Sequence, residues 1–148
     1  PVIVGPGVRS PGAAQYSSWV IEESAKGKPF SVWVEPEQRA SLVYFKDAAR
    51  ATVALAGAPA DSIEMANYLI SGTSPTAADL VDVVRRKVPG AEIDFVVNEE
   101  IQAILNDVLR PIDDRFARHE WGWEPTYDLE HMVDDFLREM HDHPQRYP

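Results

Sequence analysis

Short apolar runs alternate with helix-patterned segments along almost the whole chain, and this alternation limits the folds that the sequence can adopt. Residues 2–4 form an apolar run closed by a Gly-Pro-Gly turn, which predicts a short buried strand. The same patterns predict further strands at 31–34, 42–45, 66–70 and 93–97, and helices at 14–26, 48–55, 75–88, 99–108 and 129–140. Strands that alternate with helices favour the α/β class, although these strands are too few for a complete doubly wound sheet.

Side chains that can cap helices stand before several of the predicted helices. Asp47 precedes the helix at 48–55, Ser74 precedes Pro75 at the next helix start, and Asp128 precedes the last helix. Short acceptor side chains at such positions satisfy the free N–H groups of a first helical turn. The last helix carries an unbroken apolar stripe, made of Leu129, Met132, Val133, Phe136, Leu137 and Met140. One such stripe predicts that this helix packs against a core along one face.

The charge balance argues against two classes of partner. The chain carries 24 acidic and 14 basic residues, for a formal charge of −10, which disfavours binding to nucleic acids and to anionic membranes. No apolar run approaches the length of a membrane span, and the first residues have no signal-peptide pattern. The absence of cysteine excludes disulfides and thiolate metal sites and is compatible with a cytoplasmic protein. Because the chain begins inside a predicted strand, we expect it to be truncated.

Two features of a dinucleotide-dependent catalytic site do not occur in the sequence. A Gly-rich turn lets backbone amides approach a pyrophosphate, but the glycine cluster at 5, 7 and 12 has the wrong spacing and is interrupted by prolines. A catalytic Tyr with a Lys four residues later, which lowers the pKa of the phenol, is also missing. The residues four positions after the tyrosines at 16, 44, 68 and 127 are Val20, Ala48, Gly72 and His131. We therefore predict that this chain alone is catalytically inactive and holds no cofactor.

The histidines and tryptophans near the C-terminus are interpreted as structural or solvated residues. His119 is expected in a polar turn, and His141 and His143 in a frayed tail, so we predict no metal site. The pair Trp121 and Trp123 is expected to act as a packing anchor. In that interpretation both rings pack with Phe136 and Leu137 and dock the last helix.

An ordered series of motifs, spread from the N-terminus to about residue 140, resembles one family. Arg39 precedes the apolar run at 42–45, and Asp47 follows with an Arg-Ala-Thr triplet at 50–52. Further matching motifs lie at 57–59, 67–68, 71–75, 102–104 and 113–123. In their order these motifs are similar to the extended short-chain dehydrogenase/reductases, the NAD-dependent epimerase/dehydratase family. The spacing from Arg39 to Asp47 fits the L-threonine dehydrogenase-like branch of that family.

The resemblance implies a fold and a missing partner. The chain would supply the last Rossmann strands and the small α/β substrate-binding domain, as a single fragment over residues 1–148. An N-terminal dinucleotide-binding half, absent from the chain, would carry NAD in the complete protein.

The resemblance also implies roles for individual residues. Gly12, Ala13 and Tyr16 would form the substrate loop, while Arg39 and Tyr44 would face the small-molecule substrate. Arg39 is suited to grip a carboxylate as a fork. The residues implied to lie beside the nicotinamide are Pro1, Val2 and Ile3.

A small hydroxy or amino acid is the substrate class that the resemblance implies. The chain has Ala-Ala-Gln at 13–15 where the threonine enzymes have hydroxyl side chains, and Val-Leu at 108–109 where they have Trp-Pro. These departures put threonine itself in doubt and leave an erythronate-like hydroxy acid as an alternative. A nucleotide-sugar epimerase or dehydratase is a second alternative. A third is a non-catalytic folded fragment or interaction module, whose open strand edges favour self-association into homo-oligomers.

Overall fold

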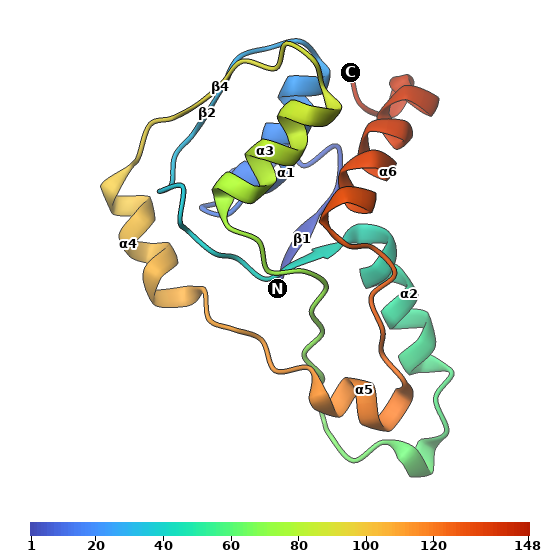
Figure 1. Ribbon diagram of the computed structural model, residues 1–148. Helices are drawn as coiled ribbons and strands as arrows, with labels where there is room; N and C mark the ends of the chain where they lie inside the picture. The colour runs from blue at the N-terminus through green and yellow to red at the C-terminus, as the bar shows by residue number, and fades with distance from the viewer.

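The computed structural model describes all 148 residues and contains two small parallel sheets (Figure 1). β1 (Val2–Val4) pairs with β3 (Leu42–Tyr44), and β2 (Phe30–Val32) pairs with β4 (Ile93–Phe95). Parallel strands cannot be joined by tight hairpins and need crossover connections, which contain helices here. This arrangement confirms the predicted α/β class.

Three helices pack on one another around the main core. α1 (Tyr16–Ala25), α3 (Ala77–Lys87) and α6 (Leu129–Asp142) are in mutual contact, and Figure 1 shows α4 (Glu99–Val108) on the opposite side of the molecule from α6. The apolar stripe predicted on the last helix accounts for its position, because Phe136 and its neighbours on that face are buried. None of the helices has the length and apolar character that crossing a membrane requires.

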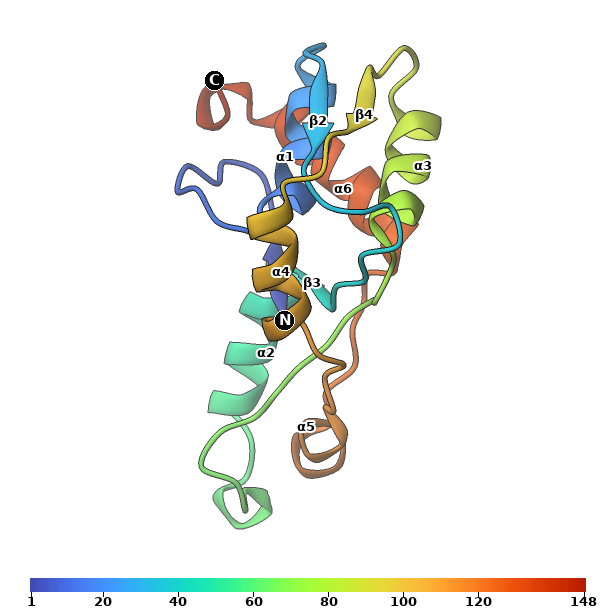
Figure 2. The ribbon, with the colours of Figure 1, turned by 90° about the vertical axis from the view of Figure 1, so that its left-hand side faces the viewer.

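The other helical segments extend the molecule away from this core. α2 (Phe45–Ala56) follows β3 directly, and it leads to the 3₁₀ turn η1 (Ala60–Ser62). Figure 2 shows these two segments and α5 (Arg115–Trp121) together at one end of the molecule. A second 3₁₀ turn, η2 (Pro144–Arg146), lies next to α6 near the C-terminus.

β3 is buried on both of its faces. Leu42 and Tyr44 point into the main core of 19 buried residues, whereas Val43 belongs to a second cluster with Ala51, Ala117 and Trp123. Side chains alternate between the two faces of a strand, so a strand between two apolar clusters reads as a continuous apolar run. This explains why the sequence pattern identified β3 clearly.

The prediction of a strand at 66–70 is wrong. That segment forms bends and extended loop, and the chain pairs with β3 only further on, through an isolated antiparallel bridge between Leu42 and Thr73. At this point Gly72 lies so close to β3 that an added Cβ would come within 2.7 Å of the Leu42 carbonyl oxygen. Only glycine can approach the Leu42 carbonyl this closely, so the chain meets the edge of β3 at Gly72 and Thr73.

Two of the three predicted helix caps are also wrong. α2 begins at Phe45, so Asp47 lies in its first turn, where the carboxylate instead accepts hydrogen bonds from the backbone of Thr126 and Tyr127. α3 is capped by Thr76, not Ser74, in a reciprocal capping box with Asp79. The predicted Asp128 cap of α6 is confirmed, since its side chain accepts from the His131 N–H at 2.9 Å.

The polar turn predicted around His119 is a helix. α5 runs from Arg115 to Trp121 and ends at Gly122, whose backbone is left-handed with φ of 71°. A short helix of mixed polarity gives little periodic signal, so the sequence pattern missed it. The expected cluster of both tryptophans with the last helix is wrong as well. Trp123 packs in the second cluster and Phe136 in the main core.

Replacing Phe136 with Ala should destabilise the protein strongly. The ring is fully buried in the main core, and truncation of a buried Phe removes apolar burial and leaves a cavity, at a cost of about 3–5 kcal/mol. Urea denaturation followed by circular dichroism measures the loss. His141→Ala on the same helix is the control, because its side chain is 88% exposed and should change stability very little. Equal midpoints for the two variants would contradict this account of how α6 is held.

Candidate functional site

A single buried carboxylate holds the long loop between β1 and α1. Glu22 on α1 accepts a hydrogen bond from the Gly7 backbone N–H at 2.8 Å and pairs with Arg9 and Lys26, each at 2.9 Å. Burial by itself would raise the pKa of Glu22, but the hydrogen bonds from Lys26, Gly7 and Arg9 outweigh it and lower the pKa below its ordinary value. The predicted substrate loop is therefore tied to α1 by charge-assisted contacts.

Trp33 fixes the end of this loop. Its indole N–H donates to the Ala13 carbonyl at 2.8 Å, and the buried Tyr16 ring meets it edge-on with ring centroids 6.2 Å apart. Burial raises the pKa of Tyr16 to about 12, so its phenol is neutral at ordinary pH. Gly12 is exposed on the same loop. Ala13 and Tyr16 are thus held rigidly, while Gly12 lies open to solvent.

A small cavity lies at the entrance to β3. It has a volume of about 130 Å³ and is lined by Arg39, Ser41, Ser74, Leu109, Arg110 and Pro111. The Arg39 guanidinium donates to the Ser74 carbonyl, and the hydroxyls of Ser41 and Ser74 lie 3.1 Å apart. The lining combines two cationic groups, two hydroxyls and an apolar wall, which is the chemistry of a site for a small organic anion.

The start of β1 lies beside this cavity. The Val2 backbone N–H donates to the Ser41 carbonyl at 2.8 Å, so Pro1 and Val2 are next to a residue of the cavity lining. Ile3 presents a 53% exposed apolar side chain at the same strand. Parallel pairing of β1 with β3 therefore places Val2 beside Ser41 of the cavity lining, whereas Ile3 pairs with Val43 further along β3.

Tyr44 lies at the other end of β3, away from the Arg39 cavity. Its ring packs between Phe45 and Tyr127, with centroid distances of 4.8 and 4.7 Å. Burial first, and then the Asp135 carboxylate, raise the pKa of Tyr44 far above its ordinary value. The structure thus places this tyrosine against α6 as a neutral, packed side chain, and does not bring it together with Arg39.

Three polar residues of the cavity were missed as site residues by sequence reasoning. Ser41, Ser74 and Arg110 come from separate parts of the chain, and only the fold brings them together. A signal existed for Arg110 alone, because the preceding residues at 108–109 were interpreted as bordering the substrate. Serines carry no comparable pattern.

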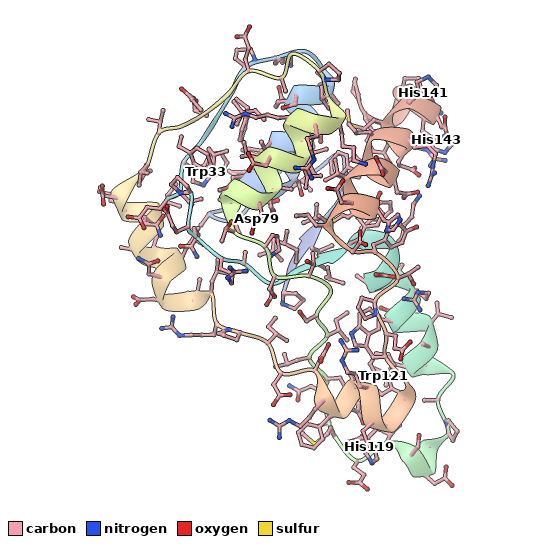
Figure 3. All side chains as sticks on the ribbon, in the orientation of Figure 1. Trp33, Asp79, His119, Trp121, His141 and His143 are labelled. Carbon is pink, nitrogen blue, oxygen red and sulfur yellow. The ribbon has the colours of Figure 1, made fainter.

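The histidines do not form a metal site. Figure 3 shows His119 at one end of the molecule and His141 and His143 at the other. No group of three or more metal-ligating side chains comes together in the structure. Asp79, labelled in the same figure, accepts a hydrogen bond from the Thr76 backbone N–H in the capping box of α3.

Comparison with curated proteins relates the chain to dehydrogenases and epimerases, although no family model matches it. It is 32% identical to the mitochondrial L-threonine 3-dehydrogenase of Bos taurus over 126 residues, which make up 85% of this chain and 34% of that enzyme. It is 26% identical to an uncharacterized epimerase/dehydratase of Staphylococcus haemolyticus over 135 residues, or 90% of this chain and 42% of that protein. The chain therefore spans between a third and a half of these relatives.

Solved structures show the same partial coverage. An L-threonine dehydrogenase from Cupriavidus necator in its holo form superposes with a TM-score of 0.84 at 33% identity, over 93% of this chain and 45% of that one. An L-threonine dehydrogenase from Phytophthora infestans gives a TM-score of 0.86 at 26% identity, over 95% and 45%. The predicted resemblance and the predicted fold are both confirmed by these likenesses.

Replacing Glu22 with Gln should loosen the loop and make stability less dependent on acid pH. A neutral amide cannot satisfy Arg9 and Lys26 as a carboxylate does, and charge-assisted hydrogen bonds contribute roughly 1.5–3 kcal/mol. Because the pKa of Glu22 is lowered from 4.5 by folding, its contribution is present above about pH 4.5 and disappears as pH falls through the lowered value. The test is to measure the unfolding free energies of wild type and Glu22→Gln from about pH 3 to about pH 7, which spans this titration.

The matched control for this experiment is Glu23→Gln. Glu23 is the next residue on α1, its side chain is 29% exposed, and it pairs only with Lys28 at 3.4 Å. Its replacement should cost less than about 1 kcal/mol. The difference in unfolding free energy between wild type and Glu22→Gln could also stay constant down to pH 3, about one unit below an ordinary Glu pKa. That result would contradict the conclusion that folding lowers the pKa of Glu22.

Proposed function

We propose that this chain forms the substrate-binding portion of an NAD-dependent oxidoreductase. The proposal follows from its relation to the L-threonine dehydrogenases and epimerase/dehydratases of the extended short-chain dehydrogenase/reductase family. Its substrate is a small hydroxy or amino acid. The observation that carries this proposal is the position of Arg39, which lines a small cavity beside the start of β1. A guanidinium there can hold a substrate carboxylate while the hydroxyl-bearing carbon points toward β1.

The size of the cavity is compatible with a small acid. Its volume of about 130 Å³ is well below the roughly 300–1,000 Å³ of pockets that bury larger ligands. Gly12, Ala13 and Tyr16 form the loop that approaches the substrate in this proposal, and Trp33 keeps it in place. Tyr44 supports the site indirectly, through the packing of β3 against α6.

The residues of this chain fit the nicotinamide end of NAD but not its pyrophosphate. The exposed side chain of Ile3 offers apolar surface to a flat ring, with Pro1 and Val2 on the same strand. The Gly7 N–H, by contrast, already donates to the Glu22 carboxylate, which would repel a phosphate. Beside Pro1, Val2 and Ile3, NAD would supply a hydride acceptor for oxidation of the substrate hydroxyl. The role of this chain is to bind and orient the acid.

A dinucleotide-binding half is the partner that the two small sheets require in this proposal. Each sheet has only two strands, and parallel sheets are normally larger and covered on both faces. Partial coverage of the relatives is consistent with such a half outside this chain. The cytoplasmic location predicted from composition stays a prediction.

Replacing Arg39 with Gln in the full-length protein should raise the KM for the acid substrate about 10- to 100-fold, with a smaller effect on kcat. The loss corresponds to one charge-assisted pair between guanidinium and carboxylate. NAD reduction is assayed with threonine, erythronate and UDP-sugars. Arg115→Gln is the matched control, because Arg115 is exposed and pairs locally with Asp113. Turnover of UDP-sugars without any response to small acids would overturn the proposal.

The isolated chain should neither reduce nor bind NAD tightly. It lacks a Gly-rich phosphate turn and a Tyr/Lys pair, so calorimetry should detect no saturable binding of NAD at micromolar concentrations. The open sheet edges favour self-association, which multi-angle light scattering measures. A clean monomer with saturable NAD binding would show that this chain holds more of the cofactor site than proposed.

A further inference from the structure

The distribution of ion pairs singles out two arginines. All but two of the 14 basic side chains lie within 4.0 Å of a carboxylate. The two without a carboxylate partner are Arg39 and Arg110. The chain carries 24 acidic residues, so acidic partners are not scarce. The lack of a carboxylate partner at these two arginines is therefore due to their positions in the fold.

Both of these arginines line the same small cavity. Arg39 reaches it from the entrance to β3, and Arg110 from the segment that follows α4. Each guanidinium is held by backbone carbonyls, Arg39 by that of Ser74 and Arg110 by those of Asn106 and Leu109. These bonds aim the side chains and help to end α4, and neither guanidinium forms an ion pair with a carboxylate within 4.0 Å.

The remaining hydrogen-bonding capacity points to an anion. A guanidinium has five N–H donors in a planar fork, and the bonds to carbonyls occupy only some of them. Ser41 and Ser74 add two hydroxyls to the same lining. Two like charges at one small cavity repel each other, and a ligand with two negative groups relieves this repulsion better than a single carboxylate does.

We infer that the substrate is a small hydroxy acid with two anionic groups, one bound by Arg39 and the other by Arg110. This inference rests on the proposed function and narrows its substrate class. Arg39 holds the carboxylate next to the reacting carbon, and Arg110 holds the second group, a carboxylate or a phosphate. Arg110 is then the residue that separates dianionic from monoanionic acids.

The test compares matched acids on the full-length protein by titration calorimetry at constant ionic strength. L-Malate differs from L-lactate by one added carboxylate, and 3-phosphoglycerate differs from glycerate by one phosphate. At least one of the two acids with a second anionic group should bind about tenfold or more tightly than its partner that lacks this group, as expected for one added charge-assisted contact. Which pair shows the preference identifies the second anionic group.

Variants assign the effect to individual residues. Arg110→Gln should reduce the affinity for the dianion to that of the monoanion and leave the monoanion unchanged. Arg39→Gln should weaken both, and the control Arg115→Gln neither. Arg110→Lys keeps the positive charge and should keep part of the preference for the acid with two anionic groups. It tests the inference even if Arg110→Gln fails to fold.

The outcomes separate this inference from the proposed function. Monoanions that bind in an Arg39-dependent way, with no preference for dianions, would overturn the inference and leave the proposed function standing. A preference for dianions that survives Arg110→Gln would also overturn it. Binding of none of the four acids would overturn the inference, while the assay with threonine and erythronate decides the proposed function separately. Binding that is insensitive to Arg39→Gln would overturn both.

Discussion

Burial of β3 on both faces is the constraint on which the rest of the structure depends. Leu42 and Tyr44 join the main core, Val43 joins the second cluster, and β1 and the segment at 72–73 lie at the two edges. A shift in the register of β3 would move its side chains out of the two apolar clusters. The position of this strand is therefore strongly specified. Arg39 and Ser41 stand immediately before it. The location of the candidate site is therefore set by the packing of a strand.

Two buried carboxylates connect loops to helices that are distant in the sequence. Glu22 on α1 holds Gly7 and Arg9, and Asp47 on α2 accepts from the backbone of Thr126 and Tyr127. A buried carboxylate is tolerated only where hydrogen bonds and positive charge compensate the lost hydration. Both groups meet this condition, so they act as fixed points for segments that have no regular structure of their own. The first of them holds the loop between β1 and α1 at Gly7 and Arg9.

The proposed site would combine a neutral pair of packed rings with a positively charged cavity. Tyr16 and Trp33 pack edge to edge, and burial keeps the phenol protonated. The cavity beside β1 holds positive charge in a chain whose overall charge is −10. The cavity attracts an anionic ligand locally, whereas the negative net charge of the chain repels it. This favours small acids that can enter the cavity over extended polyanions.

Sequence alone determined the elements whose signal is local and periodic. The stripe on α6, the Asp128 cap and the apolar run of β3 were predicted because burial on one helix face, or on both strand faces, imposes a pattern on consecutive residues. The family resemblance, which rests on an ordered series of motifs, was also readable from sequence and is confirmed by relatives and solved structures.

Only the tertiary structure decided the features that depend on contacts between distant residues. The segment at 66–70 looked like a strand, yet the edge of β3 is taken by Gly72 and Thr73, because only glycine can approach the Leu42 carbonyl so closely. The two tryptophans were expected on α6, but Trp123 packs with Val43 and Ala51 instead. The cavity itself joins residues near 40, 74 and 110. No local pattern encodes such a meeting, since it arises when packed strands and helices bring separate loops to one place.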